Sequence, residues 1–496
     1  MEKMLAFRTM KRYVEKNRVD ICLVFSVFLL GFLYYMWIFF RSRLITGVDG
    51  PYYLIQVREL FRVGSLVYGD PPLTFYLLAF FSLLLGDIML GVKVGVSFFC
   101  ALSTIPVFFL MKRVGKGRLA GFFAMLLVVF SAPYIRMMTD FMKNAVGICW
   151  LLAFIYYLHD LAFSGLKKRS LAFATFFLVL TDLTHILDFG VALLFLAFYT
   201  VLATIFDVNR RSFLMSAGIM ALVVGVFVFL AAVFFGSLFT DFNKVLSFIY
   251  SLTSPQGIGT QPPQQPPPPR HPGHFPRPPF APAIPFSIDI VGGWGVILLI
   301  LFFGASLSLY LWKKREKEAF LLLTITTSMG SIMCFPLIPN EWLGRFLLMM
   351  VVPTAIILSY GLSKMNEILN RNSKFNVSSV LVVVCLTFFV VQAGSIAVNI
   401  NPTITYVEYL DLVNMKSHIP PDSIIAVPHG MYYWVQYIDE VDVGQLSPDL
   451  WQSYSHVLGL FFKGNVPPVP FNQTIFVGNI LILVELQPPP KPLSSP

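Results

Sequence analysis

The chain has 496 residues, of which 56% are hydrophobic and only 12% are charged. Soluble proteins carry about 25% charged residues, so this composition excludes an ordinary soluble domain. The net charge of +10 does not indicate a nucleic-acid-binding protein, because the basic residues occur in short clusters that flank apolar runs. Repeated apolar runs of roughly 20 residues instead predict a polytopic helical membrane protein, since lipid offers no partner to an unpaired backbone group.

The first apolar run follows a basic N-terminal segment and is too long for the core of a cleaved signal peptide. We expect it to be retained as the first of about eleven transmembrane helices. The expected spans are residues 19–40, 88–111, 119–136, 142–163, 170–183, 189–206, 213–236, 291–312, 319–338, 345–362 and 376–396. With the N-terminus inside, 22 of the 36 Lys and Arg residues fall on the inner side, in agreement with the positive-inside rule. The sequence therefore predicts an all-α polytopic membrane protein with its N-terminus inside and its C-terminus outside.

Residues 73–86 decide this topology, because they are apolar but short for a membrane span. If they crossed the membrane, every later basic cluster would move to the outer side. We expect them to form a helix at the outer interface, in one module (residues 51–86) with the segment 51–64. Arg58 and Arg62 lie one turn apart on that segment, as is typical of an interfacial helix.

Two other outer regions differ from the apolar core. Residues 255–285 contain 13 prolines, which favour an extended or disordered spacer over a packed domain, or else a ligand for a proline-reading partner. Residues 397–496 alternate polar and β-like runs and predict a small α/β domain outside the membrane. The expected organisation is thus a transmembrane domain over 1–396 and an extracytoplasmic domain over 397–496. All five cysteines lie within expected spans, so no disulfide framework is indicated.

Two aspartates mark a candidate site on the outer side. Asp49 lies in TGVDGPYY, where Gly47, Gly50 and Pro51 predict a tight turn after the first span. A carboxylate there suits a general base for an acceptor hydroxyl, or else an N-cap for the following helix. Asp140 follows the third span with Lys143 three residues later, and can likewise be a second site acid or an N-cap with a local ion pair.

A second set of outer polar residues comes from later loops. His185 lies between Asp182 and Asp188 in TDLTHILD, either as a substrate contact or as a structural hydrogen bonder. Arg345 stands at the outer end of the tenth span near Glu341, where it holds an anionic lipid phosphate, anchors the helix at the interface, or forms an ion pair with Glu341. No DxD pair is present, so a divalent metal remains open.

The order of these segments resembles the GT-C glycosyltransferases, membrane enzymes that use a sugar on a polyprenyl-phosphate carrier. The resemblance covers residues 19–206 and rests on VDGPYYLIQVRELFRVGSL, GDPPLTFYLLAFFSLLLGD, the basic turn MKRVGKGR and SAPYIRMMTDFMKNAVG. It is closest to the protein mannosyltransferase and aminoarabinose transferase branch. The resemblance implies that Asp49 is the catalytic base, that Asp140 is the second-loop acid, and that Arg345, with Lys143, holds the donor phosphate.

The resemblance further implies an inverting transfer from a polyprenyl (dolichyl) phosphate sugar to a glycan, lipid or protein acceptor on the extracytoplasmic face of the cell membrane. No cofactor is implied with certainty. Two departures are present: Gly50 replaces the Glu that often follows the first acid, and WQSYS at 451–455 lacks the acid of the oligosaccharyltransferase WWDYG motif. The second departure disfavours en bloc transfer to asparagine. The alternatives are a transporter or flippase, or a membrane scaffold that displays the outer domain.

Overall fold

The computed structural model describes most of the chain. The described residues are 2–234, 250, 292–372, 377–428, 430–447, 449–464 and 470–488, without the side chains of 2–16, 340, 341, 369–372, 377 and 378. The proline-rich segment 255–285 therefore lies outside the described residues.

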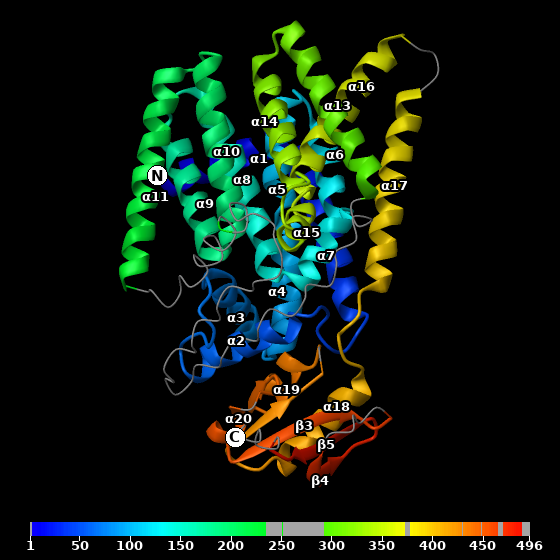
Figure 1. The fold of residues 1–496 in the computed structure, drawn as a ribbon. Helices are drawn as coiled ribbons and strands as arrows, with labels where there is room; N and C mark the ends of the chain where they lie inside the picture. The colour runs from blue at the N-terminus through cyan, green and yellow to red at the C-terminus, as the bar shows by residue number, and fades with distance from the viewer. Residues whose placement is uncertain are drawn as a thin grey trace, which may run out of the picture.

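A bundle of long helices forms the larger part of the molecule (Figure 1). Its long helices are α1 (Glu2–Phe40), α8 (Met142–Ser164), α9 (Lys168–Thr184), α10 (Ile186–Ile205), α11 (Arg210–Phe234), α13 (Gly293–Lys314), α14 (Lys317–Met333), α16 (Val351–Asn372) and α17 (Val377–Asn399). Shorter helices complete it: α4 (Ile88–Leu102) with α5 (Thr104–Val114), α6 (Arg118–Val129) with α7 (Ala132–Asp140), and α15 (Asn340–Leu348) before α16.

These helices identify the chain as a multi-pass membrane protein, but they do not fix the number of spans. Among the described residues, eight helical segments are long and apolar enough to cross a membrane, or nine if the α6–α7 pair, which bends by 47°, is one broken span. Each of the eleven expected ranges falls on these helices as far as they are described. Since α9 and α14 have only 17 residues each, the expected count of eleven remains a prediction.

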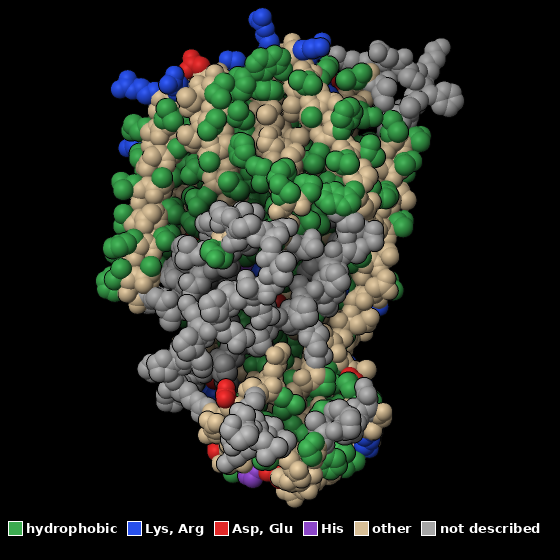
Figure 2. All heavy atoms as spheres, in the orientation of Figure 1, with side chains coloured by type: hydrophobic (Ala, Val, Ile, Leu, Met, Phe, Trp, Pro, Cys, Tyr) green, Lys and Arg blue, Asp and Glu red, His purple; other side chains and the backbone are tan. Residues whose placement is uncertain are grey.

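The two helices after the first span lie together at one end of the bundle. Helix α2 (Gly50–Arg62) and helix α3 (Leu73–Leu85) have 13 residues each, and α3 packs against α2 and α4. A helix of 13 residues is about 20 Å long and too short to cross the roughly 30 Å hydrocarbon core. Both helices lie at the end that faces the C-terminal sheet, whereas Lys and Arg side chains gather at the opposite end of the bundle (Figures 1 and 2).

Ion pairs between neighbouring helices hold the basic end of the bundle together. The Arg113 guanidinium contacts Glu318 of α14 at 2.6 Å and also pairs with Asp160 of α8. Asp20 of α1 is buried and pairs with both Lys112 and Arg118. These clusters therefore join helices that are far apart in the sequence.

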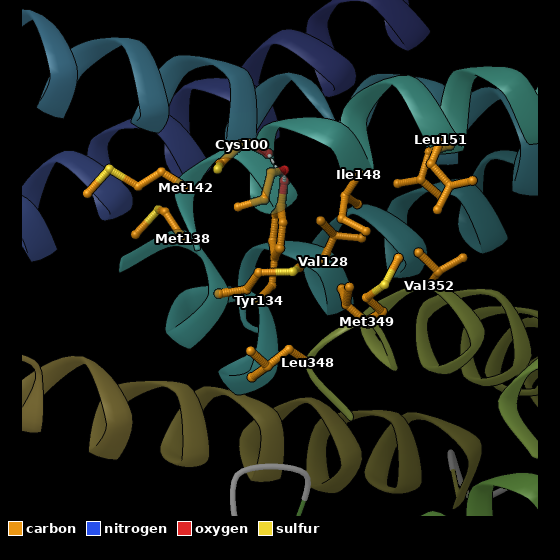
Figure 3. Close-up of a cluster of buried hydrophobic side chains, with 14 of the residues drawn as sticks. Cys100, Val128, Tyr134, Met138, Met142, Ile148, Leu151, Leu348, Met349 and Val352 are labelled. Atoms are coloured by element: carbon orange, nitrogen blue, oxygen red, sulfur yellow. Dashed lines mark hydrogen bonds between the residues drawn. The ribbon is translucent and has the colours of Figure 1, made fainter. Parts of the chain in front are cut away.

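At the centre of the bundle, Tyr134 fixes the position of α7. Its buried hydroxyl donates to the carbonyl oxygen of Ala145 at 2.9 Å and lies 3.4 Å from that of Cys100. Figure 3 shows its ring among apolar side chains that include Met138, Ile148 and Met349. This packing places the C-terminal end of α7, and with it Asp140, at the same end of the bundle as α2.

The C-terminal residues form a small mixed sheet with short helices around it. The strands are β1 (Ser423–Ala426), β2 (Asp442–Gly444), β3 (His456–Phe462), β4 (Phe471–Val477) and β5 (Leu481–Leu486), in the order β2-β1-β3-β5-β4. Strand β1 pairs in parallel with β2 and β3, whereas β5 pairs antiparallel with β3 and β4. The accompanying helices are α18 (Tyr406–Met415), the 3-10 turn η3 (Lys416–His418), α19 (Tyr432–Ile438) and α20 (Leu450–Ser453).

Helix α19 joins this sheet to helix α2. Arg58 of α2 donates to the carbonyl oxygen of Tyr437 at 2.5 Å and lies over the Tyr437 ring. Arg62 pairs with Glu440 at 3.0 Å, and the Tyr68 hydroxyl bonds to Gln436. The C-terminal sheet is thus held against the helices of residues 51–86 by contacts with α19 and with Glu440, two residues after its end.

The arrangement of α3 yields a labelling prediction. Single cysteines at Ser65 and Asp87, on either side of α3, should react with an impermeant thiol reagent from the same face of the membrane. Lys116→Cys, at the basic end of the bundle, should react from the opposite face. Asp87→Cys costs only the side-chain cap of α4, about 1 kcal/mol. Labelling of Ser65→Cys and Asp87→Cys from opposite faces would refute a non-spanning α3.

A second prediction concerns the buried Asp439, whose carboxylate oxygens have no hydrogen-bond partner among the described residues. Burial raises the pKa of Asp439 to about 8, although the charge of Lys416 opposes this shift. The ordinary pKa of an Asp is 3.8, so the folded chain holds the proton more tightly and its stability falls as pH rises from about 4 to about 8. Asp439→Asn should therefore flatten this fall, as measured by thermal unfolding at several pH values.

Glu440 provides the matched control for this measurement. The hydrogen bond from Lys416 holds the pKa of Glu440 below its usual value, so its contribution to stability is present at neutral pH and is lost as pH falls through the lowered pKa. Glu440→Gln should consequently lower stability at neutral pH, in contrast to Asp439→Asn. An unchanged pH slope in Asp439→Asn would contradict the prediction.

Candidate functional site

The turn that carries Asp49 is packed against the end of α7. Gly47 has φ +85°, and a β-carbon at this position would lie 2.0 Å from the carbonyl oxygen of Thr139. The backbone of Gly47 also pairs with residues 401 and 402, which lead into the C-terminal sheet. Only glycine fits this left-handed conformation at such a close approach. The turn is thus fixed between α7 and the segment after α17.

Asp49 occupies the N-cap position of α2, but its side chain makes no capping hydrogen bond. It is half-buried. The alternative that Asp49 serves to cap the helix therefore finds no support in the geometry.

Asp140 is the last residue of α7 and is buried. Its carboxylate pairs with Arg136 at 2.6 Å and accepts a hydrogen bond from the backbone amide of Val48, the residue before Asp49. The alternative of an N-cap paired with Lys143 is wrong, because Phe141 occupies the N-cap of α8 and Arg136 is the partner of the acid. The two candidate acids consequently belong to one site.

Lys143 and Tyr53 connect this turn to α8. The backbone amide of Lys143 donates to the Tyr53 hydroxyl at 3.1 Å, and the Lys143 ammonium pairs with the buried Asp70 at 2.7 Å. Burial raises the pKa of the Tyr53 hydroxyl; the charge of Lys143 lowers it, that of Asp49 raises it, and that of Arg345 lowers it. These three charged groups therefore surround one tyrosine.

Arg345 approaches the site from α15. Its guanidinium lies 5.4 Å from the ring centre of Phe141, which follows Asp140, and 5.7 Å from that of Trp342. Two aromatic faces hold the planar cation without consuming its hydrogen-bond donors. The forked guanidinium then suits a phosphate. Glu341, the other expected polar residue of this helix, has a side chain outside the described residues.

Together these contacts bring Asp49, Asp140, Lys143 and Arg345 to one end of the bundle. Chemically, the site combines a half-buried carboxylate, a second acid already paired with a cation, and an arginine on two aromatic rings. Such a set suits proton removal beside a bound anion.

His185 and its neighbours form an adjoining polar cluster. Its Nδ1 atom lies 3.2 Å from the amide nitrogen of Asn144 and 3.3 Å from a carboxylate oxygen of Asp188, both buried. Asn144 follows Lys143 directly on α8, which places the cluster beside the site. Asp182 is buried at the end of α9, and one of its oxygens lacks a hydrogen-bond partner among the described residues. Arg58, by contrast, is used in the contact with α19.

No metal site emerges from the described geometry. Among the residues that the structure describes, no three His, Cys, Asp or Glu side chains are grouped to hold an ion. The sequence leaves open whether the protein uses a divalent cation, and an activity assay with and without added metal is needed to decide this.

Three contacts of the site were not expected from the sequence: the acid paired with Lys143, the pairing of Arg136 with Asp140, and the Tyr53 hydroxyl. Asp70 is the partner of Lys143, and its signal was a carboxylate before two prolines in the outer loop, in GDPPL. Arg136 carried the i, i+4 spacing to Asp140 that permits a pair on one helix face. Tyr53 had no distinguishing signal, because an aromatic residue in an interfacial helix is ordinary.

The close approach at Gly47 yields a prediction with a matched control. Gly47→Ala forces a β-carbon against Thr139 and should displace the Asp49 turn, lowering the unfolding temperature. Gly64→Ala introduces the same left-handed strain, about 1–2 kcal/mol, but meets nothing within 4 Å. Thermal unfolding should show a clearly larger loss for Gly47→Ala. Equal losses would mean that the turn tolerates displacement from α7.

Comparisons with known proteins give the fold. No protein-family model matches the sequence, and no curated protein matches it. The oligosaccharyltransferase of Archaeoglobus fulgidus is similar in structure, with a TM-score of 0.58 at 15% identity over 87% of this chain. This chain spans 65% of that protein. A second structure of this enzyme holds dolichol-phosphate and an inhibitory peptide, at a TM-score of 0.58 and 14% identity over 85% of this chain and 64% of that one.

ArnT from Cupriavidus metallidurans is similar along almost its whole length. The structure bound to undecaprenyl phosphate has a TM-score of 0.55 at 12% identity, over 95% of this chain and 98% of ArnT. The resemblance to GT-C glycosyltransferases found in the sequence is thereby confirmed at the level of the fold: this chain has the GT-C architecture, a helical membrane bundle with a small C-terminal sheet domain.

Proposed function

We propose that this chain is a membrane glycosyltransferase that moves a sugar from a polyprenyl-phosphate carrier to an acceptor hydroxyl on the extracytoplasmic side. The observation that carries the proposal is the convergence of Asp49, Asp140 and Arg345 through direct contacts with Val48 and Phe141. The neighbours with dolichol-phosphate and undecaprenyl phosphate support this class of carrier.

In the proposed reaction, Asp49 takes the proton of the acceptor hydroxyl as its oxygen attacks the anomeric carbon. The bond from that carbon to the phosphate oxygen breaks, and the polyprenyl phosphate leaves with the electron pair. One displacement of this kind inverts the configuration at the sugar carbon. Asp140, bound to the Val48 amide, holds the turn that presents Asp49.

Arg345 is proposed to hold the donor phosphate and to stabilise the charge that develops on it. Preorganised cations of this kind are a large term in catalysis. Lys143 contributes less to holding this phosphate, since its ammonium is already paired with Asp70 at 2.7 Å. The buried pair thus adds little net charge, which leaves Arg345 as the principal phosphate ligand.

The test uses the full chain in lipid nanodiscs with a panel of polyprenyl-phosphate sugars. Solubilised membrane components serve as acceptors, and Mg²⁺, Mn²⁺ or EDTA is added in parallel. The readout is release of polyprenyl phosphate. Asp49→Asn should lower turnover by about 10²–10⁴-fold, the usual contribution of a general base, while binding of polyprenyl phosphate is retained. Arg345→Ala should instead weaken that binding.

Asp207→Asn is the matched control, because Asp207 is an exposed acid that follows the far end of α10. It should leave both turnover and carrier binding unchanged. A panel in which no sugar donor gives Asp49-dependent release, from a chain that folds and binds the carrier, would overturn the proposal.

A further inference from the structure

Helix α18 presents an apolar stripe on the surface of the C-terminal sheet domain. Tyr406, Val407, Leu410 and Val413 follow one another at helical spacing and are 39–44% exposed. Among the described residues from 400 onward, seven large hydrophobic side chains are exposed, and four of them belong to this stripe. Such a concentration on one helix face marks an interaction surface.

The outward direction of the stripe is fixed by the opposite face of α18. Thr405 and Glu408 form a capping box at its start. The buried Asp411 accepts hydrogen bonds from the backbone amides of Asn479, Ile480 and Leu481, at 2.7–3.0 Å, and thereby fastens the helix to the turn between β4 and β5. Rotation of α18 to bury its apolar side would break these bonds.

The beginning of α18 lies close to the segment that follows the C-terminal end of α1. The Arg43 guanidinium, three residues after the end of α1, lies 5.1 Å from the ring centre of Tyr406. Arg41 lies over the exposed Trp37 ring at 5.6 Å and donates to the carbonyl oxygen of Val398 at 2.8 Å. Exposed aromatic rings next to arginines are typical of the boundary between lipid and water.

The connection from the membrane is also short. Only six residues separate Asn399, the last residue of α17, from Tyr406, the first of α18. Helix α17 is apolar and exposes most of its surface, as expected of a helix that faces lipid. Val398, next to the end of α17, and Tyr406, at the start of α18, are both exposed.

We propose that the stripe of α18 rests in the headgroup region of the bilayer and holds the C-terminal sheet domain at a fixed height on the membrane. An amphipathic helix in this position buries its apolar face roughly 5–10 Å into the boundary between headgroups and acyl chains. Lipid is the occupant favoured by the neighbouring Trp37, Arg41 and Arg43. The inference is independent of the proposed glycosyl transfer.

The test measures lipid contact directly in the full chain. Leu410→Cys and Val413→Cys are each labelled with a nitroxide in nanodiscs of phosphatidylcholine and phosphatidylglycerol. The background carries Cys22→Ser and Cys385→Ala, because these two cysteines are not buried. Leu446→Cys and Val477→Cys are matched controls, since both replace exposed apolar residues of the same domain outside α18. The two positions on α18 check one another if one variant folds poorly.

We expect the labels at 410 and 413 to collide with oxygen far more often than with a water-soluble nickel chelate, and the control labels to show the reverse. Chelate accessibility at 410 and 413 equal to that of the controls would overturn the proposal. So would labels shielded from both reagents, which would indicate a protein partner or a second copy of this chain. Activity plays no part in this readout, so failure of the proposed function would not affect it.

Discussion

The contact between the Asp49 turn and the end of α7 is the constraint on which the candidate site depends. Gly47 allows the two backbones to approach so closely that even a methyl group would collide with Thr139. This approach lets the Val48 amide reach the Asp140 carboxylate. A buried carboxylate needs such partners, because an uncompensated charge away from water is strongly destabilising. Gly47 therefore fixes the turn that carries Asp49 and, through the Val48 amide, also provides a hydrogen bond to the Asp140 carboxylate.

The other charged residues of the candidate site are of two kinds. Some form ion pairs with a neighbouring side chain, whereas Arg345 lies against aromatic rings. Asp140 is neutralised by Arg136, and Lys143 by Asp70, at 2.6 and 2.7 Å. Breaking a buried pair of this kind costs about 3–5 kcal/mol, so these residues act first as structure. Arg345 instead rests on two aromatic rings. A cation held in this way keeps its donors for an anionic ligand.

Much of this arrangement was predictable from the sequence, and the reasons for the failures are physical. Apolar runs and basic clusters indicated the bundle, and the apolar run at residues 73–86 indicated a short helix, as α3 is. The tight turn at Asp49 followed from Gly47, Gly50 and Pro51. The pair between Asp140 and Arg136 was missed although the i, i+4 spacing on one helix permits it. The partner of Lys143 was missed because an ion pair between distant segments leaves no periodic signal. Lys143 and Asp70 are 73 residues apart, and their meeting depends on the packing of α8 against the outer module.

The module of residues 51–86 also explains how the C-terminal sheet domain is held in one position relative to the helical bundle. Arg58 reaches the carbonyl oxygen of Tyr437 from the helix that begins one residue after Asp49. The segment that leads to α18 pairs with Gly47 on the other side of the same turn. Because one connection lies on α2 and the other at the turn before it, a tilt of the sheet domain on the membrane would act on the segment that carries Asp49. Lipid contact along α18 would resist that tilt, so the height of the domain and the position of the proposed base are two aspects of one mechanical unit.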